Sequence, residues 1–373
     1  METSEQLMHG AIDVPDLATL VAGEGPFLSL YLNTGRAVEN AGPLAQQRWK
    51  TARRDLEGRG VPDALLDEIG RIVPGAHLEG DCLAVIGGVE RILHVEHGPA
   101  VSPRDEATWG PLPHLLPIVR WRQSEPSYVV VLTDRTGADL FGIRRGSREL
   151  HAEVEGEHDE LRKVGPGGWS QRRYQQRAED SWEQNAEQVA AAVERLVVQV
   201  QPAFVAVAGD VRAVGLLRES LPKEVDELVH AIEGERPWKG KGDPIPSEVH
   251  ELVARHVRER TDAVLARFRE EEGQHDKAVE GVDATATALA QSKVAVLLIA
   301  DEGDEERTLW FGPDPALIAA DDQELKALGV DSPEEGPVRE VLTRAALGTG
   351  AWIRVVDDAK ELDEGVGALL RWS

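Results

Sequence analysis

The sequence predicts an α/β protein with three domains, and three observations lead to that prediction. Its 373 residues exceed what a single hydrophobic core usually organises. Short apolar runs typical of strands alternate with longer stretches of helical periodicity. A proline-rich stretch at 111–126 and an acidic stretch at 269–281 interrupt this alternation. The expected domains are 1–123, 124–272 and 273–373.

The first domain is expected to contain a strand, two helices and a strand pair. Apolar residues alternate along PFLSLYLNT (26–34), which is typical of a strand. Helical stretches follow at about 42–60 and 62–73, and the segments DCLAVIGG and RILHVEHG indicate paired strands. The proline-rich stretch 111–126 is interpreted as the linker to the second domain.

The second domain is expected to contain a mixed sheet. Two short strands, Val129–Leu132 and Ala138–Ile143, flank a predicted hairpin turn at Asp134–Gly137. A long helix is expected from Ser170 to Val200, because apolar residues recur there at spacings of three, four and seven. The other expected elements are strands at 149–154, 204–210 and 227–232, and helices at 211–220 and 247–272.

The third domain is expected to be a small α/β sandwich. Its apolar pattern indicates a short helix followed by two strands, and then a second helix and a further strand. The expected elements are helices at 283–291 and 337–347, and strands at 293–301, 308–312 and 351–358.

The composition limits the classes of function. The net charge of −26 argues against a protein that coats nucleic acid with a broad basic face, although it permits a local basic surface. No apolar run reaches the roughly 18–20 residues of a membrane span, so no membrane partner is expected. The single cysteine, Cys82, lies in an apolar context and is predicted to be a buried core residue. A cytoplasmic location is the expectation.

One acid-free stretch stands out in a chain with 67 acidic residues. Residues 162–177 contain GPGGWSQRRYQQR and five basic side chains, those of Arg162, Lys163, Arg172, Arg173 and Arg177. Glycines allow close approach to a ligand, and a basic loop that leads into a helix N-terminus suits phosphate groups. Ser170 is predicted to be the N-cap of that helix.

The same residues also allow a second interpretation. The stretch can be a capped surface loop whose arginines pair with the acids that follow, Glu179, Asp180 and Glu183. Residue chemistry alone leaves both interpretations open.

The order Gly167-Gly168-Trp169-Ser170-Gln171-Arg172-Arg173-Tyr174 resembles a known motif. It is similar to the Gly-Gly-Gln loop and following helix of archaeo-eukaryotic class I release factors. It is also similar to bacterial relatives of these factors, which include Balon-like ribosome hibernation factors, and to eukaryotic ribosome-rescue peptidyl-tRNA hydrolases. The resemblance is strongest over about 127–262 and implies a central RNase H-like sheet with a Gly-Gly-x loop leading into a long helix.

The resemblance implies a ribosome-binding translation factor that occupies the A site. It places the loop Gly167, Gly168 and Trp169 at the peptidyl-transferase centre, and it implies a contact with elongation factor Tu. The residues that it implies for binding ribosomal RNA are Lys163, Ser170, Arg172, Arg173, Tyr174 and Arg177. The first 120 residues hold no counterpart of the family's codon-reading Asn-Ile-Lys-Ser loop, so stop-codon decoding is not expected.

The chain departs from the motif at Trp169, where the family has glutamine. An indole donates one hydrogen bond and accepts none, so it cannot replace the amide that helps to position water. The favoured hypothesis is therefore a hibernation or stress factor that binds without hydrolysis. Peptidyl-tRNA hydrolysis in ribosome rescue is the alternative.

Other candidate sites are weaker. Asp134, Asp139 and Asp210 lie near expected strand ends, but a two-metal nuclease needs acids that converge on one site, and Asp134 is interpreted as a turn residue. His250 and His256 lack the spacing of a helical zinc pair. No metal or cofactor is expected, because no Walker loop or dinucleotide fingerprint is present. The segment Trp238–Gly242 is interpreted as a polar linker, with contact to RNA or a protein partner as the alternative. Arg144, Arg145 and Arg148 are interpreted as a solvated strand end, with an extension of the basic zone as the alternative.

Overall fold

The computed structural model describes residues 10–23, 25–35, 41–99, 105–144, 150–155, 168–234, 246–274, 277–301 and 307–372, with the backbone alone at 168–181. Contacts divide the chain into two compact units, one formed by 1–124 with 257–373 and the other by 125–256. Both units are mixed α/β, as the sequence predicts. Among the helices described, none is both long enough and apolar enough to cross a membrane.

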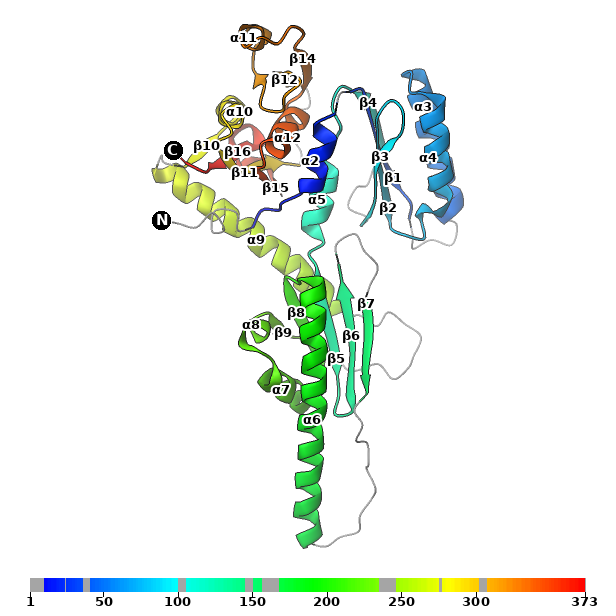
Figure 1. Ribbon diagram of the computed structural model, residues 1–373, viewed down its shortest axis with the longest axis vertical. Helices are drawn as coiled ribbons and strands as arrows, with labels where there is room; N and C mark the ends of the chain where they lie inside the picture. Colours follow the sequence, from blue (N-terminus) through cyan, green and yellow to red (C-terminus); the bar gives the residue numbers. More distant parts are fainter. Residues whose placement is uncertain are drawn as a thin grey trace. The chain divides into compact units, whose positions relative to one another are not determined.

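The central unit, 125–256, is built on a five-stranded mixed sheet (Figure 1). The strand order is β7-β6-β5-β8-β9; β6 is antiparallel to both β7 and β5, and β5, β8 and β9 run parallel to one another. This is an RNase H-like arrangement, as predicted. The strands are β5 (Tyr128–Thr133), β6 (Gly137–Ile143), β7 (Leu150–Glu155), β8 (Phe204–Gly209) and β9 (Val229–Ala231).

Helices cover both faces of this sheet, which is why β5 is apolar up to its last residue and β8 is apolar throughout. The helix α6 (Gly168–Val200) packs its apolar residues, among them Val193, on one face together with α7 (Val211–Ser220). The first turns of α9 (Ser247–Gln274) cover the other face through Val249 and Leu252. The short α8 (Lys223–Asp226) precedes β9.

The helix α6 begins two residues earlier than predicted. Its first residue is Gly168, so Ser170 lies inside the first turn and the prediction that Ser170 is the N-cap is wrong. Glycine is unfavourable in the interior of a helix, but the first position of a helix tolerates it.

Gly209, the last residue of β8, allows β8 to approach β5 closely. Its φ is +142°, and a Cβ atom built there would lie 1.7 Å from the carbonyl oxygen of Thr133. The next residue, Asp210, donates its backbone N–H to that same oxygen at 3.2 Å. Any side chain at 209 would therefore push apart the ends of β5 and β8.

We predict that Gly209→Ala lowers the free energy of unfolding by about 3 kcal/mol or more, because backbone must move to admit the methyl group. Gly215→Ala is the matched control: Gly215 lies within α7, and a Cβ there meets nothing within 4 Å. The control is expected to be neutral or to stabilise by up to about 1 kcal/mol. Urea denaturation measures both, and equal midpoints for Gly209→Ala and the parent protein would contradict the account.

The N-terminal part of the other unit is an antiparallel sheet with two helices on one face. The strand order is β3-β2-β1-β4, and α3 and α4 enclose an apolar cluster with β1 and β2. Cys82, the first residue of β2, is buried as predicted. The elements are β1 (Phe27–Asn33), α3 (Ala41–Gly58), α4 (Asp63–Ala76), β2 (Cys82–Gly87), β3 (Ile92–Gly98) and β4 (Glu106–Gly110).

The C-terminal part of this unit contains two sheets. The larger has the order β10-β16-β11-β15, with β11 and β15 parallel, and the smaller has the order β13-β12-β14. The strands are β10 (Ala278–Glu280), β11 (Val294–Ala300), β12 (Thr308–Phe311), β13 (Ile318–Ala319), β14 (Glu334–Pro337), β15 (Trp352–Val356) and β16 (Val366–Leu370). The helices are α10 (Val282–Ala290), α11 (Asp322–Ala327), α12 (Val338–Gly348) and two short 3-10 turns, η1 (Ala359–Glu361) and η2 (Asp363–Gly365).

The proline-rich stretch predicted as a linker and the acidic stretch 269–281 both contain regular secondary structure. Residues 111–126 contain α5 (Leu116–Ser124), whose Trp121 is 2% exposed, so the linker interpretation is wrong. Pro117 lies in the first turn of α5, where a proline removes no helical hydrogen bond. The acidic stretch 269–281 holds the last turns of α9 and the strand β10.

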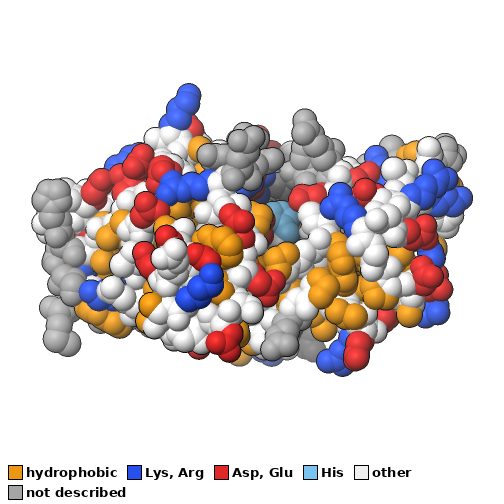
Figure 2. Space-filling view, turned by 90° about the horizontal axis from the view of Figure 1, so that it is seen from above, with side chains coloured by type: hydrophobic (Ala, Val, Ile, Leu, Met, Phe, Trp, Pro, Cys, Tyr) orange, Lys and Arg blue, Asp and Glu red, His pale blue; other side chains and the backbone are white. Residues whose placement is uncertain are grey.

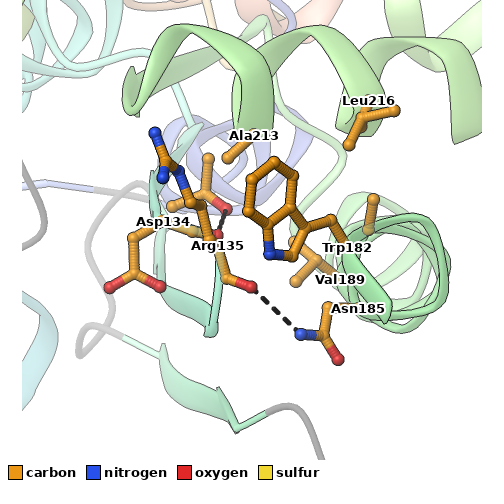
Figure 3. A pocket seen from close by; sticks show the side chains of 9 residues that line it. Asp134, Arg135, Trp182, Asn185, Val189, Ala213 and Leu216 are labelled. Carbon is orange, nitrogen blue, oxygen red and sulfur yellow. Dashed lines mark hydrogen bonds between the residues drawn. The ribbon is translucent and has the colours of Figure 1, made fainter. Parts of the chain in front are cut away.

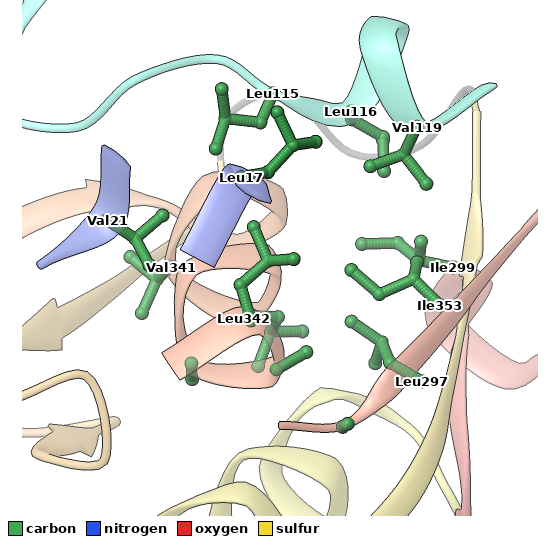
Figure 4. Close-up of a cluster of buried hydrophobic side chains, with 14 of the residues drawn as sticks. Leu17, Val21, Leu115, Leu116, Val119, Leu297, Ile299, Val341, Leu342 and Ile353 are labelled. Atoms are coloured by element: carbon green, nitrogen blue, oxygen red, sulfur yellow. The ribbon is translucent and has the colours of Figure 1, made fainter. Parts of the chain in front are cut away.

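The N-terminal and C-terminal parts of this unit share one hydrophobic core (Figure 4). Leu17 and Val21 of α2 (Pro15–Val21) and Val119 of α5 lie in the same cluster as Ile299 of β11 and Leu342 of α12. The first and last parts of the chain are therefore packed together. The boundaries 1–123, 124–272 and 273–373 stay a prediction.

A buried ion pair joins these two parts. His114 Nδ1 lies 2.6 Å from Glu340 Oε1, and the backbone N–H of His114 donates to Ser29 Oγ at 2.9 Å. Burial lowers the pKa of His114, but the bond to Glu340 and the charges of Glu340 and Glu106 together outweigh burial and leave the pKa above 6.5. Burial raises the pKa of Glu340, but the bond to His114 and the charges of His114 and Arg339, with a backbone hydrogen bond, together outweigh that effect and lower the pKa below 4.5.

The two shifts define a pH window. The stabilisation from His114 is complete below its unfolded pKa and is lost as the pH rises through the higher folded value. The stabilisation from Glu340 is complete above its unfolded pKa and is lost as the pH falls through the lower folded value. The pair therefore stabilises this unit most between pH 4.5 and 6.5, the two ordinary values.

We predict that Glu340→Gln moves the pKa of His114 from above 6.5 to below it, because burial then dominates. Glu106→Gln is the graded control, because Glu106 Oε1 lies farther away, 3.7 Å from His114 Nε2. This substitution should lower the pKa of His114 less than Glu340→Gln does. Titration of the histidine ring signals by NMR measures both. An unchanged His114 pKa in Glu340→Gln would show that the ion pair does not hold the proton.

Candidate functional site

The predicted ribosome-facing residues fall at the start of α6. Gly168, Trp169, Ser170, Arg172, Arg173, Tyr174 and Arg177 lie in its first turns, and their side chains are outside the described part. Gly167 and Lys163 lie outside the described residues altogether. The roles assigned to all nine residues therefore stay predictions.

The helix itself is long enough to carry this basic segment away from the sheet. At about 1.5 Å per residue, 33 residues span roughly 50 Å. The C-terminal half lies along the sheet, whereas the N-terminal half continues past the turn between β5 and β6 (Figure 1). Trp182 is the first residue of α6 whose side chain is described, and it contacts that turn.

Four side chains hold α6 against the end of the sheet, and we call them the anchor cluster: Arg135, Trp182, Asn185 and Asp210. Figure 3 shows Arg135, Trp182 and Asn185. The guanidinium of Arg135 lies over the Trp182 ring, 4.8 Å from its centroid. Arg135 Nη2 also donates to Asp210 Oδ2 at 3.0 Å, and Asn185 Nδ2 donates to the Arg135 carbonyl oxygen at 3.0 Å. The cluster thus ties α6, the β5–β6 turn and the end of β8 together.

Asp210 has a second role as the N-cap of α7. Its Oδ1 accepts from the backbone N–H groups of Arg212 at 3.0 Å and Ala213 at 3.3 Å. Burial raises the pKa of this carboxyl, but the bonds from Arg135 and the two N–H groups outweigh burial and lower it below 3.8. Asp210 is therefore a charged structural group at neutral pH.

Asp134 stabilises the hairpin turn, as predicted. Its Oδ1 accepts from Thr136 N and Thr136 Oγ1 at 2.7 Å, and from Gly137 N at 3.0 Å. In the described part of the chain, no group of three or more His, Cys, Asp or Glu side chains could hold a metal ion. The structure thus gives no geometric support to the nuclease alternative for Asp134, Asp139 and Asp210.

The hollow beside the anchor cluster is too small for a substrate. It offers about 10 Å³, which is close to the room needed by one water molecule. Asn185 is 4% exposed, and its Oδ1 has no protein partner among the described residues, so a single water there would satisfy it. The cluster can position α6, but it offers no cavity for chemistry.

The weaker candidates do not join this site. Arg144 Nη2 donates to the Gln199 carbonyl oxygen at 2.7 Å, which pins the end of β6 to the end of α6. His256 packs against the Phe204 ring, 5.6 Å away between centroids. Residues 145–148 and 238–242 lie outside the described residues.

Charge is mixed on the surface that can be seen. Figure 2 shows acidic and basic side chains interspersed over the described residues on the face viewed from above. The net charge of −26 fits this picture. The sequence concentrates basic residues between 162 and 177, where no acidic residue interrupts them.

Comparison with known families decides the relationship of the central unit. Residues 127–274 match the family model of bacterial archaeo-eukaryotic release factor family 2. The central part of the chain is a bacterial relative of the archaeo-eukaryotic release factors. This confirms the resemblance that the Gly-Gly-Trp sequence and the long helix suggest, and the chain is release-factor-like over the segment that carries α6 and the anchor cluster.

Similar proteins cover nearly the whole chain. Two uncharacterized proteins of Mycobacterium tuberculosis, from strains CDC 1551 / Oshkosh and ATCC 25618 / H37Rv, are each 28% identical over 367 residues, 96% of this chain and 96% of the relative.

Three of the similar solved structures have lower sequence identity. Archaeoglobus fulgidus Pelota is 16% identical with a TM-score of 0.35, covering 78% of this chain and 80% of that one. Saccharomyces cerevisiae Dom34, a translation termination-like factor, is 11% identical with a TM-score of 0.38, covering 69% and 66%. A model of ribosome-bound archaeal Pelota and ABCE1 is 14% identical with a TM-score of 0.40, covering 78% of this chain and 78% of that one. These TM-scores are below 0.5, so no conclusion about this chain depends on them.

We predict that Trp182→Ala speeds amide hydrogen exchange at residues 183–190 by about tenfold or more, because a helix without tertiary contacts is only marginally stable. Glu183→Ala is the matched control, since Glu183 is the next residue and is exposed. Mass spectrometry after exchange measures both variants. Equal rates in Trp182→Ala and Glu183→Ala would mean that the anchor cluster does not hold α6.

Proposed function

We propose that the protein is a ribosome-binding translation factor that occupies the A site, as a hibernation or stress factor, without hydrolysing peptidyl-tRNA. One observation carries the proposal. Gly168 and Trp169 of the Gly-Gly-Trp motif are the first two residues of a 33-residue helix, within the segment that matches the release-factor family. The start of this helix would reach the peptidyl-transferase centre.

The chemistry of a helix start supports contact with ribosomal RNA. The first turn of a helix leaves four N–H groups without a helical acceptor, and the helix dipole places positive charge there. Arg172, Arg173 and Arg177 add three charges within the next turns of the sequence. Together these groups suit phosphate, and the acidic remainder of the chain would face solvent or protein partners.

The anchor cluster supports a positioning role. A helix whose N-terminus must reach a distant site needs a fixed position on the sheet. Trp182, Arg135 and Asp210 link α6 to two loops of the sheet. The partners in this proposal are the ribosome and, as the family resemblance implies, elongation factor Tu. Such a factor would act in the cytoplasm.

Trp169 supports binding over hydrolysis, because its indole cannot accept a hydrogen bond from water. The glycine pair Gly167 and Gly168, however, favours a second candidate, peptidyl-tRNA hydrolysis in ribosome rescue. In that case backbone groups of the loop would position the water.

We predict that Arg172→Glu with Arg173→Glu weakens co-sedimentation with ribosomes by an order of magnitude or more near 0.15 M salt. The slope of log K against log salt concentration should also fall by roughly two, about one for each lost phosphate contact. Arg195→Glu is the matched control, because Arg195 is an exposed residue on the same helix. No co-sedimentation of the parent protein at this salt concentration would refute the ribosome-binding proposal.

A release assay separates the two candidates. The purified protein is mixed with ribosomes that carry labelled peptidyl-tRNA in the P site, and freed peptide is counted. We predict binding without peptide release. Release that disappears in Gly168→Ala would overturn the non-catalytic proposal and establish the hydrolase.

A further inference from the structure

The helix α3 of the N-terminal part carries a second acid-free basic stretch, and the structure describes all of it. Residues 41–54 contain no acidic side chain and four basic ones, those of Arg48, Lys50, Arg53 and Arg54. The helix lies beside α4 on one face of the N-terminal sheet (Figure 1). The start of α6 lies in the other unit, so the two basic stretches are separate features of the chain.

The packing of α3 determines which of its side chains face solvent. Trp49 is 6% exposed, and a Cβ atom built on Gly70 of α4 would lie 3.4 Å from its Nε1. Arg53 Nη2 lies 2.9 Å from Asp67 Oδ1, which is also on α4. The opposite side of α3 is exposed, and we call its residues, spaced three or four apart, the outer ridge: Gln46, Gln47, Lys50, Thr51 and Arg54.

The two charges of the outer ridge have no counter-charge. The other two arginines of α3 pair with carboxylates, since Arg48 Nε lies 3.5 Å from Asp105 Oδ2 and Arg53 has its partner on α4. Within the described part of the chain, the side chains of Lys50 and Arg54 form neither a hydrogen bond nor an ion pair. Their charges are therefore available to a partner outside this chain.

Acidic residues near the ridge are already paired. Asp55 Oδ2 lies 2.8 Å from Arg59 Nη2, and Glu57 Oε1 accepts from Arg53 Nε at 2.8 Å. Two undescribed segments adjoin α3 and Asp105 in the sequence, 36–40 and 100–104. Together they hold one acid and two bases, Glu39, Arg36 and Arg104, so they bring no excess of negative charge.

The spacing of Lys50 and Arg54 has a cost that an anion would offset. Side chains four residues apart on a helix are neighbours, with Cβ atoms about 5–6 Å apart. Like charges at this spacing repel and weaken a helix, whereas Arg53 and Glu57 in the same helix use the spacing for opposite charges. A phosphate group close to both Lys50 and Arg54 would turn the repulsion into attraction.

The uncharged members of the ridge indicate which kind of anionic partner fits. Gln46, Gln47 and Thr51 can hydrogen-bond to phosphate and sugar oxygens, and side chains of these types commonly contact a nucleic-acid backbone beside lysine and arginine. The only aromatic residue of α3, Trp49, is buried, so the ridge offers no ring for a base to stack on. The surface therefore suits a sugar-phosphate backbone and not unstacked bases.

We propose that the outer ridge of α3 binds the sugar-phosphate backbone of ribosomal RNA, with Lys50 and Arg54 on phosphates and the glutamines and Thr51 on the sugar edges. This surface is a second contact with the ribosome, distinct from the start of α6, and it rests on the proposed function. It confers attachment without reading a base sequence.

Co-sedimentation with ribosomes over a series of salt concentrations tests the ridge. We expect Lys50→Glu with Arg54→Glu to weaken binding about tenfold near 0.15 M salt and to reduce the slope of log K against log salt concentration by roughly two. Lys326→Glu with Lys360→Glu is the matched control, because it makes the same change in charge at two exposed positions in the C-terminal part of the same unit. Equal affinities and slopes in the two double variants would overturn the proposal.

A photo-crosslinking amino acid at position 51, in the middle of the ridge, identifies the class of partner. We expect cross-links to ribosomal RNA, recognised because ribonuclease degrades the attached partner. Cross-links to ribosomal protein alone, or no cross-link while the protein still co-sediments, would overturn this proposal and leave ribosome binding intact. A parent protein that does not co-sediment would instead refute the proposed function, and this proposal with it.

Discussion

The stacking of Arg135 on Trp182 is the interaction on which the functional account depends most. A helix of 33 residues cannot direct its far end unless its base is fixed, and packing against the sheet fixes only the C-terminal half. Arg135 adds a contact at the middle of α6, and its bond to Asp210 connects that contact to β8. Gly209 makes this possible, because it lets the end of β8 lie against Thr133.

A different set of interactions unites the other unit. The first and last parts of the chain share a hydrophobic core, and the His114–Glu340 pair crosses between them. Arg354, 1% exposed on β15, adds hydrogen bonds to the carbonyl oxygens of Gly10 at 2.9 Å and Val257 at 2.8 Å. Burial of this guanidinium lowers its pKa to about 10, which still leaves it charged at neutral pH. These hydrogen bonds thus determine how the N-terminal and C-terminal parts of this unit pack, because apolar contacts are less directional.

The sequence predicted local structure well where periodicity and turn chemistry agree. The hairpin around Asp134 and the long apolar stripe of α6 are examples, because each depends on neighbouring residues. It failed at α5, where proline suggested a linker although a first-turn position tolerates it. Short strands such as β10 and β16 were missed because three to five residues carry little periodic signal.

The anchor cluster could not be predicted for a different reason. Trp182 lies in the periodic apolar pattern of α6, but nothing in the neighbouring sequence indicates that its partner is Arg135 in a distant turn. The same holds for His114 with Glu340, whose contact exists only once both segments have folded. The motif at Gly167–Tyr174 differs from these contacts, because it was predicted from adjacent residues in the sequence. Its side chains lie outside the described part of the structure.

The most direct test of the central claim places a photo-crosslinking amino acid at position 169 and mixes the protein with ribosomes whose A site is empty. The account predicts cross-links to large-subunit ribosomal RNA at the peptidyl-transferase centre, and it predicts that tRNA bound beforehand in the A site abolishes them. Cross-links to another region of the ribosome, or cross-links that persist when the A site is filled, would contradict it.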